Sequence, residues 1–297
     1  MIVVRIYEGL GNQMFEYAYA YALSRRLESR GIKVYIDVRE EAVTEFDKKR
    51  YGRSLDILQF NIKLPRADES ILRHWTYLND NKILHRIIYF FLEHRLWKYK
   101  VLKEFEYNYT NNYLRVEDNT YIVGWFLHYQ YFEKYRNELL REFTCAEKWC
   151  IPEQLKKIME DYQVISVHVR RGDYVNNSKI RKMMCELGEK YYQTAVSCLQ
   201  SELTFPYLFI FTDDEEWVEE NLEFEIPSLV VSNHFNLSAL QEMILMSQCN
   251  HNIIANSTFS WWGAWLNVHE DKIVIAPKHW FVDKKRNNIA MKSWILV

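Results

Sequence analysis

The chain has 297 residues, of which 48% are apolar and 16% aromatic, with a formal net charge of −2 at pH 7. This length is comfortable for two domains that each bury a core of their own. The near-neutral charge gives no support to bulk nucleic-acid binding, so we expect no nucleic-acid partner.

The cysteines and the N-terminus indicate the compartment. The five cysteines form no C-x-x-C or Cys/His metal spacing, and their odd number and low density favour a reducing compartment over a disulfide framework. The first residues resemble a strand and lack the basic and long apolar regions of a signal peptide. No window approaches the ~18 apolar residues of a membrane span. We therefore expect a soluble, cytoplasmic protein.

The chain opens as a strand, a glycine-containing turn, a helix and a second strand, over residues 2–7, 8–13, 14–30 and 33–37. A strand, such a turn and a helix N-terminus together form a corner suited to an anion or a sugar. Asn12 and Gln13 lie in this turn and offer neutral hydrogen bonds to a ligand. Asn12 also suits the simpler role of a helix cap.

The same opening is shared by dinucleotide-binding units. Gly9 and Gly11 supply two of the three fingerprint glycines, and Asp37 ends the second strand. The third position, where close helix–strand packing needs glycine, is Met14. A nicotinamide or flavin enzyme is therefore a weaker alternative.

Residues 82–103 interleave basic and aromatic side chains. This pattern fits an amphipathic helix in peripheral contact with an anionic membrane or a lipid-linked acceptor. It also fits a helix of the first domain with a solvated basic face, which is the favoured interpretation. A strand at 120–124 and a helix at 131–143 follow.

The second half of the chain alternates regularly between strands and helices. The expected strands are 164–169, 207–212, 228–232, 251–255 and 272–276, and the expected helices are 189–203, 214–223, 238–249 and 259–269. Such alternation predicts a doubly wound parallel sheet. The fold class is therefore α/β, with one domain over residues 1–150 and a second over 151–297.

The strand at 164–169 delivers His168, Arg170, Arg171 and Asp173 to its C-terminal end. Ligands bind outside such strand ends in open α/β sheets. Two adjacent guanidiniums repel each other unless an anion lies between them, and arginine suits phosphate oxygens. The simpler alternative is an ordinary surface pair between Arg171 and Asp173, with Arg170 solvated.

Two further strand ends carry polar residues. The run of acids after 207–212 is best explained by Thr212 or Asp213 capping the next helix, rather than by a metal site. Small polar residues follow the strand at 251–255, namely Asn256, Ser257, Thr258 and Ser260. They suit a helix N-terminus that binds an anion, or a helix cap alone. A diphosphate between this corner and the arginines is physically sensible.

Residues 168–173, His-Val-Arg-Arg-Gly-Asp, resemble the HxRRxD motif shared by α1,2-, α1,6- and protein O-fucosyltransferases. Five other segments resemble, in chain order, the signatures of the α1,2-fucosyltransferases of glycosyltransferase family 11. These segments are residues 9–18, 209–217, 245–266, 275–281 and 293–294. The resemblance spans nearly the whole chain.

The resemblance implies a GT-B-like fold of two α/β domains facing across a cleft, the first on the acceptor side and the second binding GDP-β-L-fucose. It implies inverting transfer of L-fucose to the 2-hydroxyl of a galactose-terminated glycan, without a metal or another cofactor. The chain is similar to the bacterial, cytoplasmic members that build surface polysaccharides such as O-antigen. A carbohydrate- or nucleotide-sugar-binding protein on a degenerate transferase fold is the alternative that is not an enzyme.

The resemblance also assigns residues. Arg170 is the expected diphosphate clamp, with His168 and Arg171 shaping the same site and Asp173 ordering the loop. Asn12, in the loop with Gly9 and Gly11, would face the fucose or the acceptor. Donor contacts are expected from Asn256, Ser257, Thr258 and Ser260.

Glu242 stands where the family usually has aspartate. Its carboxylate is expected to accept the N1–H and amine of guanine, unless it only favours a helix N-terminus electrostatically. The chain departs from the family pattern at two places. Glu8 stands where the family usually has a glycine, and Phe126 with His128 stand where it often has an aromatic–Gln pair. Together with Gln13, these are the acceptor-side candidates. Asp173 and Glu8 are weak candidates for a general base.

Overall fold

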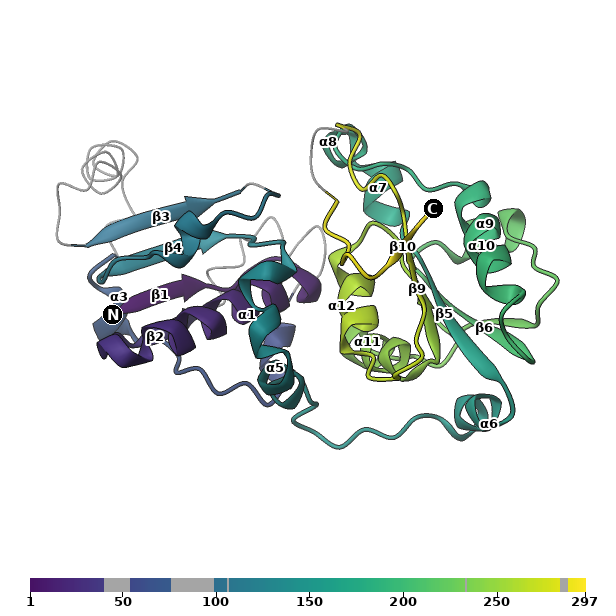
Figure 1. Cartoon of the computed structure of the whole chain (residues 1–297), viewed down its shortest axis with the longest axis horizontal. Helices are drawn as coiled ribbons and strands as arrows, with labels where there is room; N and C mark the ends of the chain where they lie inside the picture. Colours follow the sequence, from purple (N-terminus) through teal and green to yellow (C-terminus); the bar gives the residue numbers. More distant parts are fainter. Residues whose placement is uncertain (40–53, 76–98, 106, 233, 284–287) are drawn as a thin grey trace. The chain divides into compact units, whose positions relative to one another are not determined.

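The computed structural model describes residues 1–39, 54–75, 99–105, 107–232, 234–283 and 288–297. The chain divides into two compact units, Met1–Ala146 and Glu147–Val297 (Figure 1). Each unit is built on its own parallel sheet. The expected α/β class is confirmed.

Unit 1 has a four-stranded parallel sheet in the order β2-β1-β4-β3. The strands are β1 (Ile2–Arg5), β2 (Val34–Asp37), β3 (Lys100–Glu104) and β4 (Thr120–Gly124). The helices within the described residues of unit 1 are α1 (Leu10–Leu27), α3 (Glu69–Leu72) and α5 (Arg136–Glu142), with 3-10 turns η1 (Glu28–Arg30), η3 (Asp56–Gln59), η5 (Asn111–Leu114), η6 (Tyr129–Tyr131) and η7 (Glu133–Tyr135). The expected helix over 131–143 is wrong in its first half, where 3-10 turns replace it.

Helix α1 is the core of unit 1. It begins at Leu10 rather than at the expected Met14, with Gly9 in extended conformation as its N-cap. Most of its side chains are buried, and its chain leaves through Gly31, which adopts the left-handed conformation at φ 67°. Glycine accepts this conformation without steric cost. The early start means that Gly11 and Asn12 lie inside the first helical turn.

Helix α1 places an acidic residue, Glu16, in the core of unit 1. Its side chain has no exposed surface, and its Oε2 accepts a hydrogen bond from the Tyr7 backbone N–H at 2.8 Å. Burial is the main cause that raises the pKa of Glu16 well above its ordinary value. Folding therefore favours the protonated, neutral form of this carboxyl.

We expect Glu16→Gln to remove a pH-dependent loss of stability. A carboxyl with a raised folded-state pKa binds more protons folded than unfolded, so wild-type stability falls as pH rises above the unfolded pKa. Relative to the variant, the free energy of unfolding of the wild type should fall by about 1.4 kcal/mol per pH unit over the first pH units above pH 5. Denaturant unfolding of both proteins between pH 5 and 8 measures this, with Glu133→Gln on exposed η7 as the control. Parallel curves for wild type and Glu16→Gln would disprove the neutral acid.

Unit 2 has a six-stranded parallel sheet in the order β10-β9-β8-β5-β6-β7. The strands are β5 (Gln163–Val169), β6 (Pro206–Thr212), β7 (Ser228–Val230), β8 (His251–Ile253), β9 (Val274–Ala276) and β10 (Ile295–Leu296). The helices are α6 (Glu153–Asp161), α7 (Gly172–Asn176), α8 (Ser178–Arg181), α9 (Glu189–Gln200), α10 (Glu215–Asn221), α11 (Ala239–Gln248) and α12 (Thr258–Leu266). The strand–helix alternation expected from the sequence is confirmed.

The core of unit 2 fixes the ends of its central strands. Strand β5 is buried along nearly all its length, because apolar residues on both faces meet helices. Trp261, Trp262 and Trp265 of α12 are almost fully buried and contact one another, with ring centroids of Trp261 and Trp262 5.0 Å apart. This rigid packing positions the loops that leave β5, β6 and β8.

The basic aromatic segment is only partly described. Residues 82–98 lie outside the described residues, so the proposed membrane contact stays a prediction. Its last residues form strand β3 and not the expected helix. Within the described parts of the chain, no helix is both long and apolar enough to cross a bilayer.

Candidate active site

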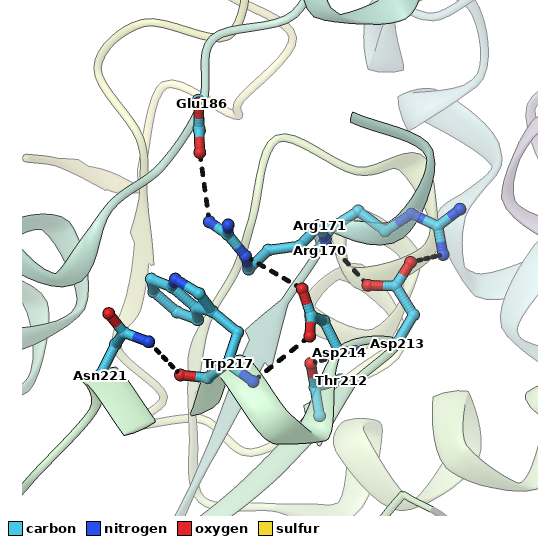
Figure 2. Close-up of polar contacts among 8 residues, drawn as sticks. All are labelled: Arg170, Arg171, Glu186, Thr212, Asp213, Asp214, Trp217 and Asn221. Atoms are coloured by element: carbon cyan, nitrogen blue, oxygen red, sulfur yellow. Dashed lines mark hydrogen bonds and ion pairs between the residues drawn. The ribbon is translucent and has the colours of Figure 1, made fainter. Parts of the chain in front are cut away.

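The candidate site lies at the C-terminal ends of β5 and β6 in unit 2. These strands pair in register, with Val169 opposite Thr212. The residues that follow each strand therefore lie close together. The pair Arg170 and Arg171 meets the pair Asp213 and Asp214 (Figure 2).

Asp213 organises the arginine loop. Its Oδ2 lies 2.7 Å from Arg170 Nη1, and its Oδ1 accepts the Arg171 backbone N–H at 2.8 Å. A Cβ at Gly172 would lie 2.8 Å from the same Oδ2, so only glycine fits there without a shift. One carboxylate thus fixes both the Arg170 guanidinium and the backbone of the loop that carries it.

Arg171 is enclosed rather than presented to a ligand. Its guanidinium lies 4.0 Å from the centroid of the Trp217 ring and contacts Asp214 at 3.2 Å and Glu186 at 3.3 Å. Its side chain is only 11% exposed. The Arg171 guanidinium is thus held by a cation–π contact and by two carboxylates, so Arg171 stabilises the loop. The side chain of Asp173, on α7, lies outside what the structure describes, and so does its expected pairing with Arg171.

Helix α10 is capped by Asp214, whose side chain accepts the Trp217 backbone N–H at 3.3 Å. The expected cap at Thr212 or Asp213 is wrong by one or two positions. The Thr212 hydroxyl instead accepts the Asp214 N–H at 3.0 Å. This leaves Asp213 to the arginines, a role that the sequence reasoning missed and that the strand register alone would have indicated.

His168 lies beside this cluster as a neutral imidazole. Its side chain is buried, and among the described residues its Nδ1 has no hydrogen-bond partner. Burial, reinforced by the charge of Arg170, lowers the pKa of His168 to about 3. The Arg170 guanidinium is therefore flanked by a polar group that adds no charge at physiological pH.

The corner after β8 is held by its own side chains. Asn256 donates from Nδ2 to the carbonyls of Cys185 and Trp280 at 2.7 and 3.0 Å, which ties two loops together. Ser257 caps α12 by accepting the Phe259 N–H at 3.3 Å. The Ser260 hydroxyl is buried against backbone carbonyls, and Thr258 begins the helix. The expected helix cap is confirmed at Ser257, and anion binding at this corner stays a prediction.

Glu242 connects the ends of two strands. Its Oε1 accepts a hydrogen bond from the Ser232 hydroxyl at 2.7 Å, and that hydroxyl accepts the Thr212 N–H at 3.0 Å. Burial, with a further contribution from the charge of Asp213, raises the pKa of Glu242 to about 7. Glu242 therefore titrates near physiological pH, and its pKa depends in part on the charge of Asp213, which contacts the arginines.

Unit 1 carries a second polar group, at the turn between β1 and α1. Glu8 adopts φ 64°, which explains why glycine is usual here in the family it resembles. Its Oε1 accepts the Trp125 indole N–H at 2.9 Å, and its Oε2 accepts the Asn12 amide. Because both oxygens are engaged, Glu8 is a poor candidate for a general base.

The remaining acceptor-side candidates are mainly structural. Gln13 has no exposed surface and hydrogen-bonds the backbone of Glu8, Ser54 and Ile57 at 2.7, 2.7 and 2.9 Å. Phe126 is also fully buried, stacked 3.6 Å from the Tyr19 ring. An acceptor role for these two does not fit their burial. The ring of His128 is half-buried and caps η6 through the Gln130 N–H at 3.3 Å.

The dinucleotide alternative finds no support at Asp37. Its carboxylate is fully buried and accepts the Tyr121 hydroxyl at 2.6 Å and the Arg39 guanidinium at 2.8 Å. Such a carboxylate is not open to a ribose. In the described portions, no group of three or more His, Cys, Asp or Glu side chains is arranged to hold a metal ion.

The whole chain, residues 1–297, matches the family described as "Glycosyl transferase family 11". It is 33% identical over 301 residues to the O-antigen biosynthesis glycosyltransferase WbnK of Escherichia coli, covering 97% of each chain. It is 29% identical to an α-1,2-colitosyltransferase of Escherichia coli, covering 100% of this chain and 99% of the relative. The galactoside α-(1,2)-fucosyltransferase 2 of Pongo pygmaeus is 27% identical over 49% of this chain and 44% of its own.

Among solved structures, the α-1,6-fucosyltransferase NodZ, known from Bradyrhizobium, is similar with a TM-score of 0.50 and 15% identity. The match covers 89% of this chain and 91% of NodZ, and it supports the expected GT-B-like fold. Together with the full-length family match, these findings define the protein as a glycosyltransferase. The chain belongs to glycosyl transferase family 11.

Proposed function

We propose that the protein transfers L-fucose from GDP-β-L-fucose to the 2-hydroxyl of a β-galactoside at the end of an acceptor glycan. The reaction inverts the anomeric centre and forms an α1,2 linkage, in the synthesis of a surface polysaccharide such as O-antigen. Relatives named for O-antigen synthesis and for α1,2 transfer support this proposal.

The observation that carries the proposal is the Arg170 loop. A buried neutral imidazole and a guanidinium on a braced loop lie together at the C-terminal ends of parallel strands. That edge is where α/β sheets bind nucleotides. As the bond to fucose breaks, negative charge develops on the GDP diphosphate, and a preorganised guanidinium stabilises it. Donor contacts from Glu242 and from the N–H groups at α12 belong to the same proposal.

Product analysis tests this function. The purified protein is incubated with GDP-fucose and a panel of β-galactosides, and products are analysed by mass spectrometry and by NMR of the linkage. The expected product is an α1,2-fucoside. A GDP-activated colitose donor is run in parallel, because the colitosyltransferase matches the full chain. Transfer of colitose alone would correct the sugar, and absence of any transfer with retained nucleotide binding would favour a binding protein.

We expect catalysis to be independent of a divalent metal. In metal-dependent transfer a cation neutralises the leaving diphosphate, and here that role is assigned to Arg170. Initial rates should be unchanged in excess EDTA and should not rise on adding Mg²⁺ or Mn²⁺. A chelator-sensitive rate that either metal restores would show that the clamp is incomplete without an ion.

A further inference from the structure

Three aromatic rings gather where β3 and β4 of unit 1 end. These strands are paired side by side, with Glu104 opposite Gly124 (Figure 1). Phe105 and Trp125 follow those positions, and their ring centroids are 5.2 Å apart. The Tyr107 ring lies 5.4 Å from Trp125. Phe105 is 44% exposed, so this cluster, the aromatic platform of Phe105, Tyr107 and Trp125, reaches the surface.

The central ring of the platform is held in a fixed orientation. The Trp125 indole N–H donates to Glu8 Oε1 at 2.9 Å, and its backbone N–H donates to the Glu104 carbonyl at 3.2 Å. A Cβ at the preceding Gly124 would lie only 2.3 Å from that same carbonyl, so glycine is required for this close approach. The polar atom of the indole is thus satisfied within the chain, and the partly exposed ring lies against Phe105 and Tyr107.

Backbone strain accompanies this arrangement. Glu8, which holds the indole, has φ 64°, and Phe126, which follows it, has φ 49°. Positive φ in a bulky side chain is costly and is retained where the surrounding structure enforces it, which is common at functional sites. Here the enforcement comes from the buried stack of Phe126 on Tyr19, with parallel rings 3.6 Å apart. Two residues with positive φ thus adjoin the indole, since Glu8 accepts its N–H and Phe126 follows it in the chain.

We propose that the aromatic platform binds the terminal sugar ring of the acceptor, with Glu8 as the positioning residue that sets the indole. A pyranose presents a face of C–H bonds, which packs on an aromatic face, and a rim of hydroxyls for polar groups. The C-terminal edge of a parallel sheet is the usual place for such a ligand. This inference rests on the proposed function, because it assumes a glycan acceptor.

The test compares Trp125→Ala with Trp125→Phe in the full chain. We expect the alanine variant to raise KM for a β-galactoside such as N-acetyllactosamine by about tenfold, and the phenylalanine variant by less, since an aromatic face remains. Affinity for GDP and the rate of GDP-fucose hydrolysis without acceptor should stay at wild-type values in both. Phe105→Ala, at an exposed ring, serves as a second variant that does not disturb the core. Tyr162→Ala, at a half-exposed ring of unit 2, is the matched control.

Direct binding separates this inference from the proposed function. Saturation-transfer NMR of N-acetyllactosamine with wild type and Trp125→Ala needs no donor. Binding that the alanine variant abolishes supports the platform even if wild type transfers no fucose, which would overturn the function alone. Unchanged KM and unchanged saturation transfer in Trp125→Ala and Phe105→Ala would overturn the platform while leaving the function standing. If the two variants lost GDP affinity as strongly as acceptor affinity, the platform would also be overturned, because the substitutions would then act through the structure as a whole.

Discussion

Arg170→Ala should reduce turnover about 10²–10³-fold, the typical loss on removing a group that stabilises charge in the transition state. The fold should survive, because Asp213 keeps its bond from the Arg171 N–H and is 27% exposed to water. Steady-state kinetics with saturating GDP-fucose measure the loss, and circular dichroism confirms the fold. Lys156→Ala, at an exposed cation of α6, is the control for net charge.

Arg170→Lys distinguishes a clamp from a simple positive charge. An ammonium keeps the charge but cannot donate two parallel hydrogen bonds to neighbouring phosphate oxygens. We therefore expect the lysine variant to recover little of the lost turnover. Near-normal activity of Arg170→Lys would show that a positive charge suffices at this position, and it would contradict the bidentate clamp.

Glu242→Gln should weaken GDP binding about 10- to 100-fold, as expected for a charged hydrogen bond made in a buried site. It should also narrow the preference for GDP over ADP, because guanine offers a donor pair to a carboxylate and adenine does not. Calorimetric titration of both nucleotides gives the affinities, and Glu219→Gln on the exposed face of α10 is the control. Unchanged GDP affinity would place base recognition elsewhere.

The pKa of Glu242, raised to about 7, adds a pH signature. If the carboxylate form receives guanine, binding below pH 7 must first remove the proton, so GDP affinity falls as pH drops from 8 to 6. Phosphate ionisation affects wild type and variant alike. The difference in slope between wild type and Glu242→Gln therefore isolates this carboxyl, and identical slopes would contradict its ionised role.

The strand–helix alternation of unit 2 was predictable because buried parallel strands are short apolar runs that need no partner to be recognised. Strand β3 was not, because its Lys-Val-Leu-Lys-Glu sequence is embedded in a basic aromatic stretch with helical character. Helix α1 begins early because tertiary burial of Leu10 and Gly11 outweighs the turn preference of two nearby glycines.

The candidate site was predictable in its motif and less so in its contacts. Two adjacent arginines at the end of a strand are recognisable in the sequence. The carboxylate that each one contacts depends on the register of β5 with β6. Gln13 resembles a ligand-binding amide, and only its bonds to Ser54 and Ile57, about forty residues away in the chain, show it to be internal. Trp125 gave no signal, since its role depends on the conformation of Glu8.

The carboxylate of Asp213 is an internal competitor for any anion that binds Arg170. A diphosphate that takes this guanidinium exchanges with an ion pair already formed, so its net gain is smaller than at an unpaired arginine. If GDP is the product, as proposed, the internal pair would re-form when GDP leaves, which would favour dissociation and shorten the residence time of the product. Product release limits turnover in many enzymes. Under the proposed function, the Arg170–Asp213 pair would therefore lower nucleotide affinity and speed the exchange of GDP between catalytic cycles.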